Sequence, residues 1–109
     1  MSLTVVDQVI ELACHITAVV EQVRPHNKEL ASQLERAWTR TATGAAEAQH
    51  RRGEKGRNRL DDAYGEARES MAALRYAGAC RWAHVDDALL QRVDGVAAQL
   101  YVLARRAPR

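Results

Sequence analysis

Apolar residues recur at intervals of three and four along most of the chain, which is the spacing of one face of an α-helix. Between residues 4 and 23 the apolar stripe consists of Val6, Val9, Ile10, Ala13, Ile16, Val20 and Val23. Thr4 followed by Asp7 is a capping-box signal for the start of this helix. Pro25 predicts its end, because a residue that precedes proline is displaced from helical backbone angles.

The rest of the chain divides into three more helical stretches of similar length. They are predicted over residues 28–49, 59–82 and 87–105. Asn27 and Asp86 stand just before two of them, where a short polar side chain can accept a hydrogen bond from the first turn. Each helix is about 30 Å long at 1.5 Å per residue. Four helices with short links favour one domain over residues 1–109, an all-α antiparallel up-down-up-down four-helix bundle.

The link between the second and third predicted helices is a basic segment, residues 50–58. Gly53 and Gly56 are expected to interrupt helix formation there and to allow a turn. Asn58, with Asp61 three residues later, marks the predicted start of the third helix. The sequence therefore predicts a basic loop at one end of the bundle.

Both tryptophans lie at informative positions. Trp38 belongs to the apolar stripe of the second helix, which places it in the core or in a seam between helices. Trp82 ends the third helix and either covers the end of the bundle or anchors a partner. Since interfaces favour tryptophan, both are candidate contacts to a partner or to a second copy. Residues 37–48 otherwise carry few large side chains, so another backbone can come close to them.

The overall charge is nearly balanced, with 16 basic and 14 acidic residues and a formal net charge of +2. Binding to an acidic partner must therefore depend on where the charges lie. The basic segment and the helix before it supply seven candidate nucleic-acid-binding residues: Arg36, Arg40, Arg51, Arg52, Lys55, Arg57 and Arg59. One interpretation is a solvated loop whose charge offsets acids elsewhere. The other is an anion-binding end for a phosphate backbone or an acidic protein surface.

The residues show no pattern typical of catalysis or of cofactor binding. Glu47 and His50 have the spacing of a bundle metal motif, but the motif occurs once and a di-iron site needs two. We therefore expect no catalytic residue, no metal and no cofactor. Cys14 and Cys80 are far apart and are expected to be reduced thiols, buried or half-buried, in a cytoplasmic protein. No run is long and apolar enough to predict a membrane span.

The order of four short motifs resembles a known bacterial family. The motifs are residues 33–37 (Gln-Leu-Glu-Arg-Ala), 45–48 (Ala-Ala-Glu-Ala), 56–59 (Gly-Arg-Asn-Arg) and 67–74 (Ala-Arg-Glu-Ser-Met-Ala-Ala-Leu). They resemble the small four-helix-bundle proteins encoded within intervening sequences of bacterial 23S ribosomal RNA genes. That family is similar to the accessory proteins of diversity-generating retroelements. The resemblance covers the chain from about residue 30 to residue 103.

This resemblance implies the same bundle fold and adds expectations about assembly and partners. It implies a homopentamer around a central channel, with RNA, DNA or a reverse-transcriptase-like protein as partner, and no catalytic activity. We therefore expect a homo-oligomeric bundle that binds nucleic acid or a nucleoprotein through its basic segment. The alternative is a protein-only adaptor or scaffold that does not bind nucleic acid.

Overall fold

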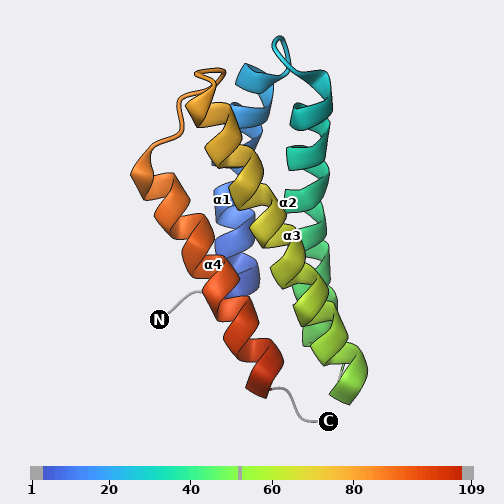
Figure 1. The fold of residues 1–109 in the computed structure, drawn as a ribbon. Coiled ribbons are helices and arrows are strands. Elements are labelled where there is room, and N and C mark those ends of the chain that lie inside the picture. Colours follow the sequence, from blue (N-terminus) through green and yellow to red (C-terminus); the bar gives the residue numbers. More distant parts are fainter. Residues whose placement is uncertain (1–3, 52, 107–109) are drawn as a thin grey trace.

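The computed structural model describes residues 4–51 and 53–106, and over these residues the chain forms four helices and no strand. They are α1 (Val5–Val23), α2 (Lys28–Gln49), α3 (Gly53–Ala79) and α4 (Asp87–Arg106). Each helix packs against the next along the chain, and α1 and α4 also contact each other (Figure 1). The protein is an all-α, up-down-up-down four-helix bundle, as the apolar periodicity predicts.

Short polar side chains start three of these helices. Thr4 and Asp7 form a capping box at α1, in which each side chain accepts a hydrogen bond from the other's backbone. Asn27 caps α2 and Asp86 caps α4, each accepting a backbone N–H from three residues on, at 2.9 and 2.8 Å. The predicted starts of α1, α2 and α4 are therefore confirmed, because the signal for each lies within one helical turn.

The core-facing side of α1 differs in part from the predicted stripe. Val9, Ile16, Val20 and Val23 are buried as expected, together with Leu12 and Val19. Ile10 was expected in the stripe but is 58% exposed. The correction arises because α1 offers two adjacent apolar edges, and packing against α2 and α4 selects the one that carries Leu12.

Trp38 lies in the core, one of the two positions that its spacing predicts. Only 3% of the residue is exposed, and its indole Nε1 donates a 3.0 Å hydrogen bond to the backbone carbonyl of Val9 in α1. The expectation that Trp38 contacts a partner is therefore corrected, because its side chain is enclosed by the bundle.

Small residues bring α2 and α3 together, as the composition of residues 37–48 predicts. A Cβ placed on Gly44 would lie 3.2 Å from the Cβ of Ala63 and 3.4 Å from the carbonyl oxygen of Arg59. The two backbones thus pass each other at a distance that only glycine fits without adjustment.

The third helix begins earlier than predicted and also ends earlier. It was expected over residues 59–82, but α3 spans Gly53–Ala79, so most of the expected basic loop is helical. Gly53 adopts a left-handed φ of 69°, which reverses the chain within the turn and lets α3 start at once. The glycines therefore shape the turn and do not interrupt the helix.

The early end of α3 follows from a Schellman motif. Arg81 adopts a left-handed φ of 61° in the position that glycine usually takes. The N–H groups of Arg81 and Trp82 bond back to the carbonyls of Gly78 and Ala77, at 3.1 and 3.0 Å. These bonds satisfy the last carbonyls of the helix and direct the chain toward α4.

Trp82 covers the end of the bundle where α1 turns into α2. Its ring stacks on that of His26, with centroids 6.1 Å apart, and contacts Tyr76 at 5.6 Å. The residue is half-buried, so one of the two roles expected of it, covering the bundle end, is what the structure shows.

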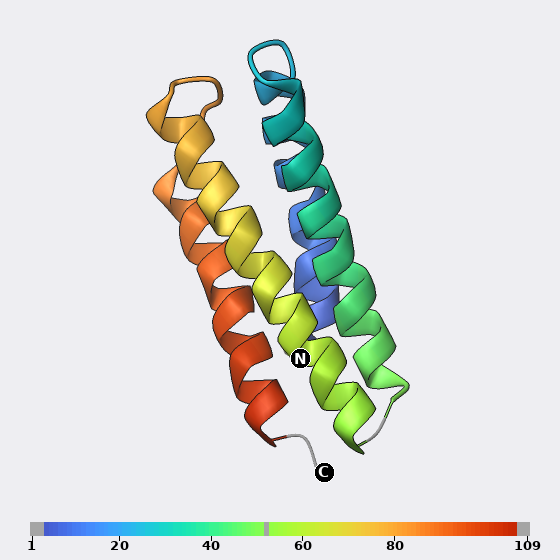
Figure 2. The same ribbon diagram turned by 45° about the vertical axis from the view of Figure 1, so that its right-hand side comes forward.

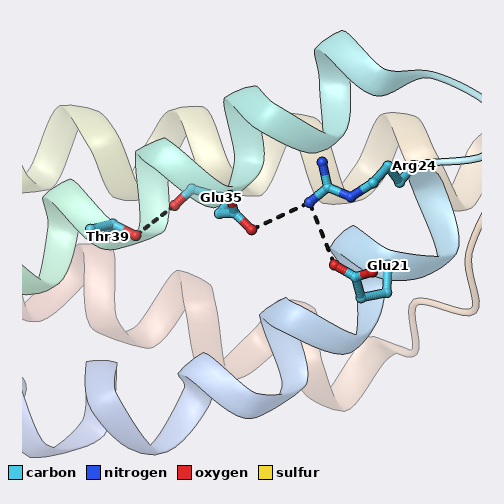
Figure 3. A network of polar contacts seen from close by, with 4 residues as sticks. All are labelled: Glu21, Arg24, Glu35 and Thr39. Carbon is cyan, nitrogen blue, oxygen red and sulfur yellow. Dashed lines mark hydrogen bonds and ion pairs between the residues drawn. The ribbon is translucent and has the colours of Figure 1, made fainter.

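Polar contacts secure the same turn from the outside. Arg24 lies 3.5 Å from the Glu21 carboxylate of α1 and 3.4 Å from the Glu35 carboxylate of α2 (Figure 3). In the same network the Thr39 hydroxyl donates to the backbone carbonyl of Glu35 at 2.8 Å (Figure 3). Because these groups are largely exposed, the ion pairs orient the turn more than they stabilise the fold.

Candidate functional site

The opposite end of the bundle gathers the α2–α3 turn and the last turns of α4, and α1 begins short of it. Figures 1 and 2 both show the other three helices extending past the start of α1. The space below α1 is a groove of about 880 Å³. We call this the end groove; its apolar lining includes Ala45, Ala48, Leu60, Val102 and Leu103, and Arg51 and Arg106 also line it.

Gly56 shapes the turn that carries the basic residues. A Cβ on Gly56 would lie 2.5 Å from the carbonyl oxygen of Arg51, closer than real Cβ atoms approach backbone oxygen. The turn can therefore pack directly onto the first turns of α3. As a result Arg51 and Lys55 are exposed beside each other, and Arg57 is half-buried.

Three of the seven predicted basic residues lie at this end without an ion pair to any described residue. They are Arg51, Lys55 and Arg57. Arg59 lies nearby, but its guanidinium is 3.1 Å from the Glu47 carboxylate and 3.6 Å from that of Asp62. Arg52 falls outside the described residues. The charge available for an anion is therefore concentrated in fewer groups than the sequence suggests.

Arg36 and Arg40 are not brought to this end. Both are exposed on α2, about 20 Å and 14 Å along the helix axis from Gln49. Arg40 also lies 4.0 Å from the Glu66 carboxylate of α3. Neither residue therefore joins Arg51 and Lys55 in one surface.

The antiparallel fold adds cations from α4 that sequence reasoning did not count. Arg106 lines the end groove together with Arg51, and no described residue forms an ion pair with it. Arg51, Lys55, Arg57 and Arg106 together define what we call the basic end. Glu54 is the acid nearest to it in sequence. The signal that could have found Arg106 is topological, since in an antiparallel bundle the C-terminus of the fourth helix lies beside the second turn.

A second surface begins next to the basic end, on the edge shared by α3 and α4. Tyr64 of α3 and Tyr101 of α4 lie with ring centroids 5.4 Å apart at an interplanar angle of 58°. Arg105 extends over the Tyr101 ring, with its Cζ 4.2 Å from the centroid, and donates a 2.8 Å hydrogen bond to Asp61. Two hydrogen bonds raise the pKa of Arg105 above its ordinary value. The bond to Asp61 has the larger effect and the bond to Tyr101 the smaller one.

The other titratable groups form no comparable centre. Among the described residues, no three His, Cys, Asp or Glu side chains are grouped closely enough to hold a metal ion. Cys14 and Cys80 are free and exposed, which corrects the expectation of buried or half-buried thiols, because both lie outside the packed faces of their segments. None of the described helices is both long and apolar enough to span a membrane.

Comparison with known proteins bears on the fold. No family model matches the chain, and no curated protein matches it either. The structure is similar to that of a protein of unknown function from the S23 ribosomal protein family of Bacteroides thetaiotaomicron, with a TM-score of 0.71. The two sequences are 19% identical, and the match covers 93% of this chain and 94% of that chain. The likeness shows the fold, a four-helix bundle over nearly the whole chain.

Proposed function

We propose that this protein is a non-enzymatic, homo-oligomeric helical bundle that binds nucleic acid, or a nucleoprotein partner, through its basic end. The observation that carries the proposal is the gathering of Arg51, Lys55, Arg57 and Arg106 at one end without carboxylate partners among the described residues. Guanidinium groups suit phosphate because they donate two parallel hydrogen bonds to it.

The resemblance to the proteins of 23S ribosomal RNA intervening sequences supports the same kind of function. The related retroelement accessory proteins suggest a reverse-transcriptase-like protein as one nucleoprotein partner, and the family suggests five copies. Repetition of the basic end around a symmetry axis would turn a few cations into an extended basic surface.

Removing two cations of the basic end is expected to weaken binding to RNA and DNA. For the double variant Arg51→Ala/Lys55→Ala, the slope of log affinity against log salt should shrink by about 1.4, as expected for two lost contacts to a single strand. Fluorescence anisotropy of a labelled oligonucleotide over a salt series measures this slope.

The matched control is Lys28→Ala/Arg81→Gly, which removes the same two charges at the opposite end of the bundle. Glycine suits the left-handed backbone of Arg81, so the control should remain folded and bind as the natural sequence does. Absence of binding at low salt, or equal losses in both variants, would contradict the proposal.

Self-association is expected to involve the end groove. Val102 and Leu103 of α4 are 41% and 40% exposed there, and with Ala45, Ala48 and Leu60 they form a continuous apolar lining of the kind that marks an interaction site. The native mass should be a multiple of 12.1 kDa, and Val102→Glu/Leu103→Glu should reduce it to that of one chain. Ile10→Glu, an exposed position away from the groove, is the control. Native mass spectrometry that finds one chain for the natural sequence would contradict the oligomer.

The alternative function is a protein-only adaptor or scaffold. The apolar lining of the end groove favours it, because such a surface also suits a helix of another protein. It predicts that the purified protein carries no nucleic acid. The ratio of absorbance at 260 and 280 nm, together with the salt series above, separates the two functions.

A further inference from the structure

The edge shared by α3 and α4 exposes part of two neighbouring tyrosine rings. Tyr101 is 45% exposed, and Tyr64 beside it is half-buried. Their tilted contact, 5.4 Å between centroids, leaves part of each ring accessible. Exposed apolar groups are common on protein surfaces, so the distinguishing feature of this edge is that two tyrosine rings from different helices lie together. Two neighbouring rings offer a surface on which a ligand with a flat apolar face can stack.

Each of the two rings is accompanied by a guanidinium group. Arg68 lies 5.9 Å from the Tyr64 ring centroid and donates a 3.2 Å hydrogen bond to its hydroxyl. Arg105 lies 4.2 Å from the Tyr101 ring centroid and is held there by Asp61. The edge thus presents aromatic and guanidinium surfaces next to one another, two groups on which nucleobases stack.

The edge is continuous with the basic end. Arg57, Tyr64 and Arg68 are spaced by seven and then four residues on α3, which places them on one side of the helix. From Arg57 to Arg68 the rise is about 16 Å. Arg57 also belongs to the basic end. A ligand bound at the basic end can therefore extend along α3 from Arg57 to Arg68.

The edge keeps two guanidinium groups without a carboxylate partner in the described part of the chain, although its acids nearly balance its cations when Glu54, three residues before Arg57, is counted. Asp61 is used by Arg105, at 2.8 Å. Asp94 lies seven residues before Tyr101 on the same side of α4. Arg57 and Arg68 form no ion pair with any residue that the structure describes. Two guanidinium groups are therefore available for phosphate, that of Arg68 beside Tyr64 and that of Arg57 about 10 Å further along α3.

We propose that this edge binds a single-stranded nucleic acid, with unpaired bases stacking on Tyr101 and Arg105 and with phosphates contacted by Arg57 and Arg68. Stacking requires the flat face of a base, which a duplex hides within its helix and a single strand exposes. An acidic protein would use the cations but leave the tyrosine rings without a matching surface. The inference rests on the proposed function and adds the class of nucleic acid.

The test compares single strands with duplexes. The full chain is titrated at one salt concentration with RNA and DNA single strands of about ten nucleotides, within the usual range of site sizes, and with duplexes of the same sequence. The natural sequence should bind single strands more tightly than duplexes. Tighter binding of either single strand than of its duplex supports the inference, and the RNA and DNA arms show which sugar is accepted.

The decisive variant is Tyr101→Leu, which keeps an apolar side chain but removes the aromatic face. It should weaken single-strand binding by roughly fivefold to 160-fold, the effect of losing one stacked base, and leave duplex binding unchanged. Tyr101→Phe, which keeps the ring, should restore binding. Tyr76→Leu is the matched control, because Tyr76 is 55% exposed at the opposite end of α3.

The failure of this inference differs from the failure of the proposed function. If single strands and duplexes bind equally, or if Tyr101→Leu binds like the natural sequence while Arg51→Ala/Lys55→Ala binds weakly, the stacking edge is overturned and the basic end stands. If the natural sequence binds no nucleic acid at low salt, both are overturned. Thermal unfolding of each variant verifies that the bundle is intact.

Discussion

Trp38→Ala is expected to lower the free energy of unfolding by about 3–5 kcal/mol, the range for deleting a large buried aromatic side chain. Trp38 is 3% exposed and belongs to the core cluster that also contains Val9. Alanine would leave a cavity between α1 and α2, and it would remove the indole donor that bonds to the Val9 carbonyl at 3.0 Å. In a domain of this size such a loss is a large part of the total stability.

Urea unfolding followed by circular dichroism measures this effect. Trp82→Ala is a useful comparison, because Trp82 is half-buried at the bundle end and should cost less. Trp38→Phe keeps much of the ring volume and loses the hydrogen bond, so it should lie between the natural sequence and Trp38→Ala. A loss below about 1 kcal/mol for Trp38→Ala would mean that the bundle does not pack around this side chain.

Gly56→Ala is expected to lower the free energy of unfolding by about 1–3 kcal/mol, the cost of forcing extra atoms into a packed site. Its Cβ would lie 2.5 Å from the carbonyl oxygen and 3.1 Å from the carbonyl carbon of Arg51. These are backbone atoms, so no flexible side chain can yield, and the α2–α3 turn itself must move. The displacement would also carry Arg51 away from Lys55 and so weaken the basic end.

Gly65→Ala provides the control with the opposite sign. Gly65 is exposed within α3, and apart from its chain neighbours and the adjacent backbone of its own helix no described atom lies within 4 Å of the Cβ that alanine would add. Alanine there should stabilise the protein by roughly 0.5–1 kcal/mol, the difference in helix propensity. Chemical denaturation of both variants gives the comparison. Equal gains at both positions would show that the turn does not approach Gly56 as closely as described.

Much of the fold could be predicted because its signals are local. Asn27 and Asp86 act within the first turn of their helices. Helix α1 ends just before Pro25 as predicted, but the expected reason is wrong, because Arg24 keeps helical angles of φ −51° and ψ −44°. The apolar period of each stretch extends over several turns and needs no knowledge of its partner helix. The prediction that Ile10 is buried was wrong because it depended on a non-local feature. Which of the two apolar edges of α1 is buried depends on the helices that pack against it.

The first and last residues of α3 could not be predicted from local signals. A glycine pair indicates either a break or a tight turn, and the choice at Gly53 and Gly56 depends on whether α2 and α3 pack closely. Likewise, Arg81 takes a left-handed conformation that a sequence pattern assigns to glycine. Both ends of α3 therefore depend on tertiary contacts, which cannot be inferred from the identity of a single residue.

The candidate site likewise has a part that the sequence predicts and a part that only the fold brings together. The basic residues Arg51, Lys55 and Arg57 are evident in the sequence because they are neighbours in it. The sequence does not show which of these cations form ion pairs with carboxylates. It also does not show that Arg106 lies at the same end or that the Tyr64 and Tyr101 rings are in contact. Those groups come from helices far apart along the chain, and their distances exist only once the bundle has formed.

The sequence by itself determined that four amphipathic helices form and where capped ones begin, because hydrophobic period and capping chemistry operate over a few residues. The tertiary structure alone decided which cations remain without a carboxylate partner and which tyrosines lie side by side. The physical reason is that ion pairing and ring contacts depend on separations of a few ångströms between different helices, and those separations are set by packing.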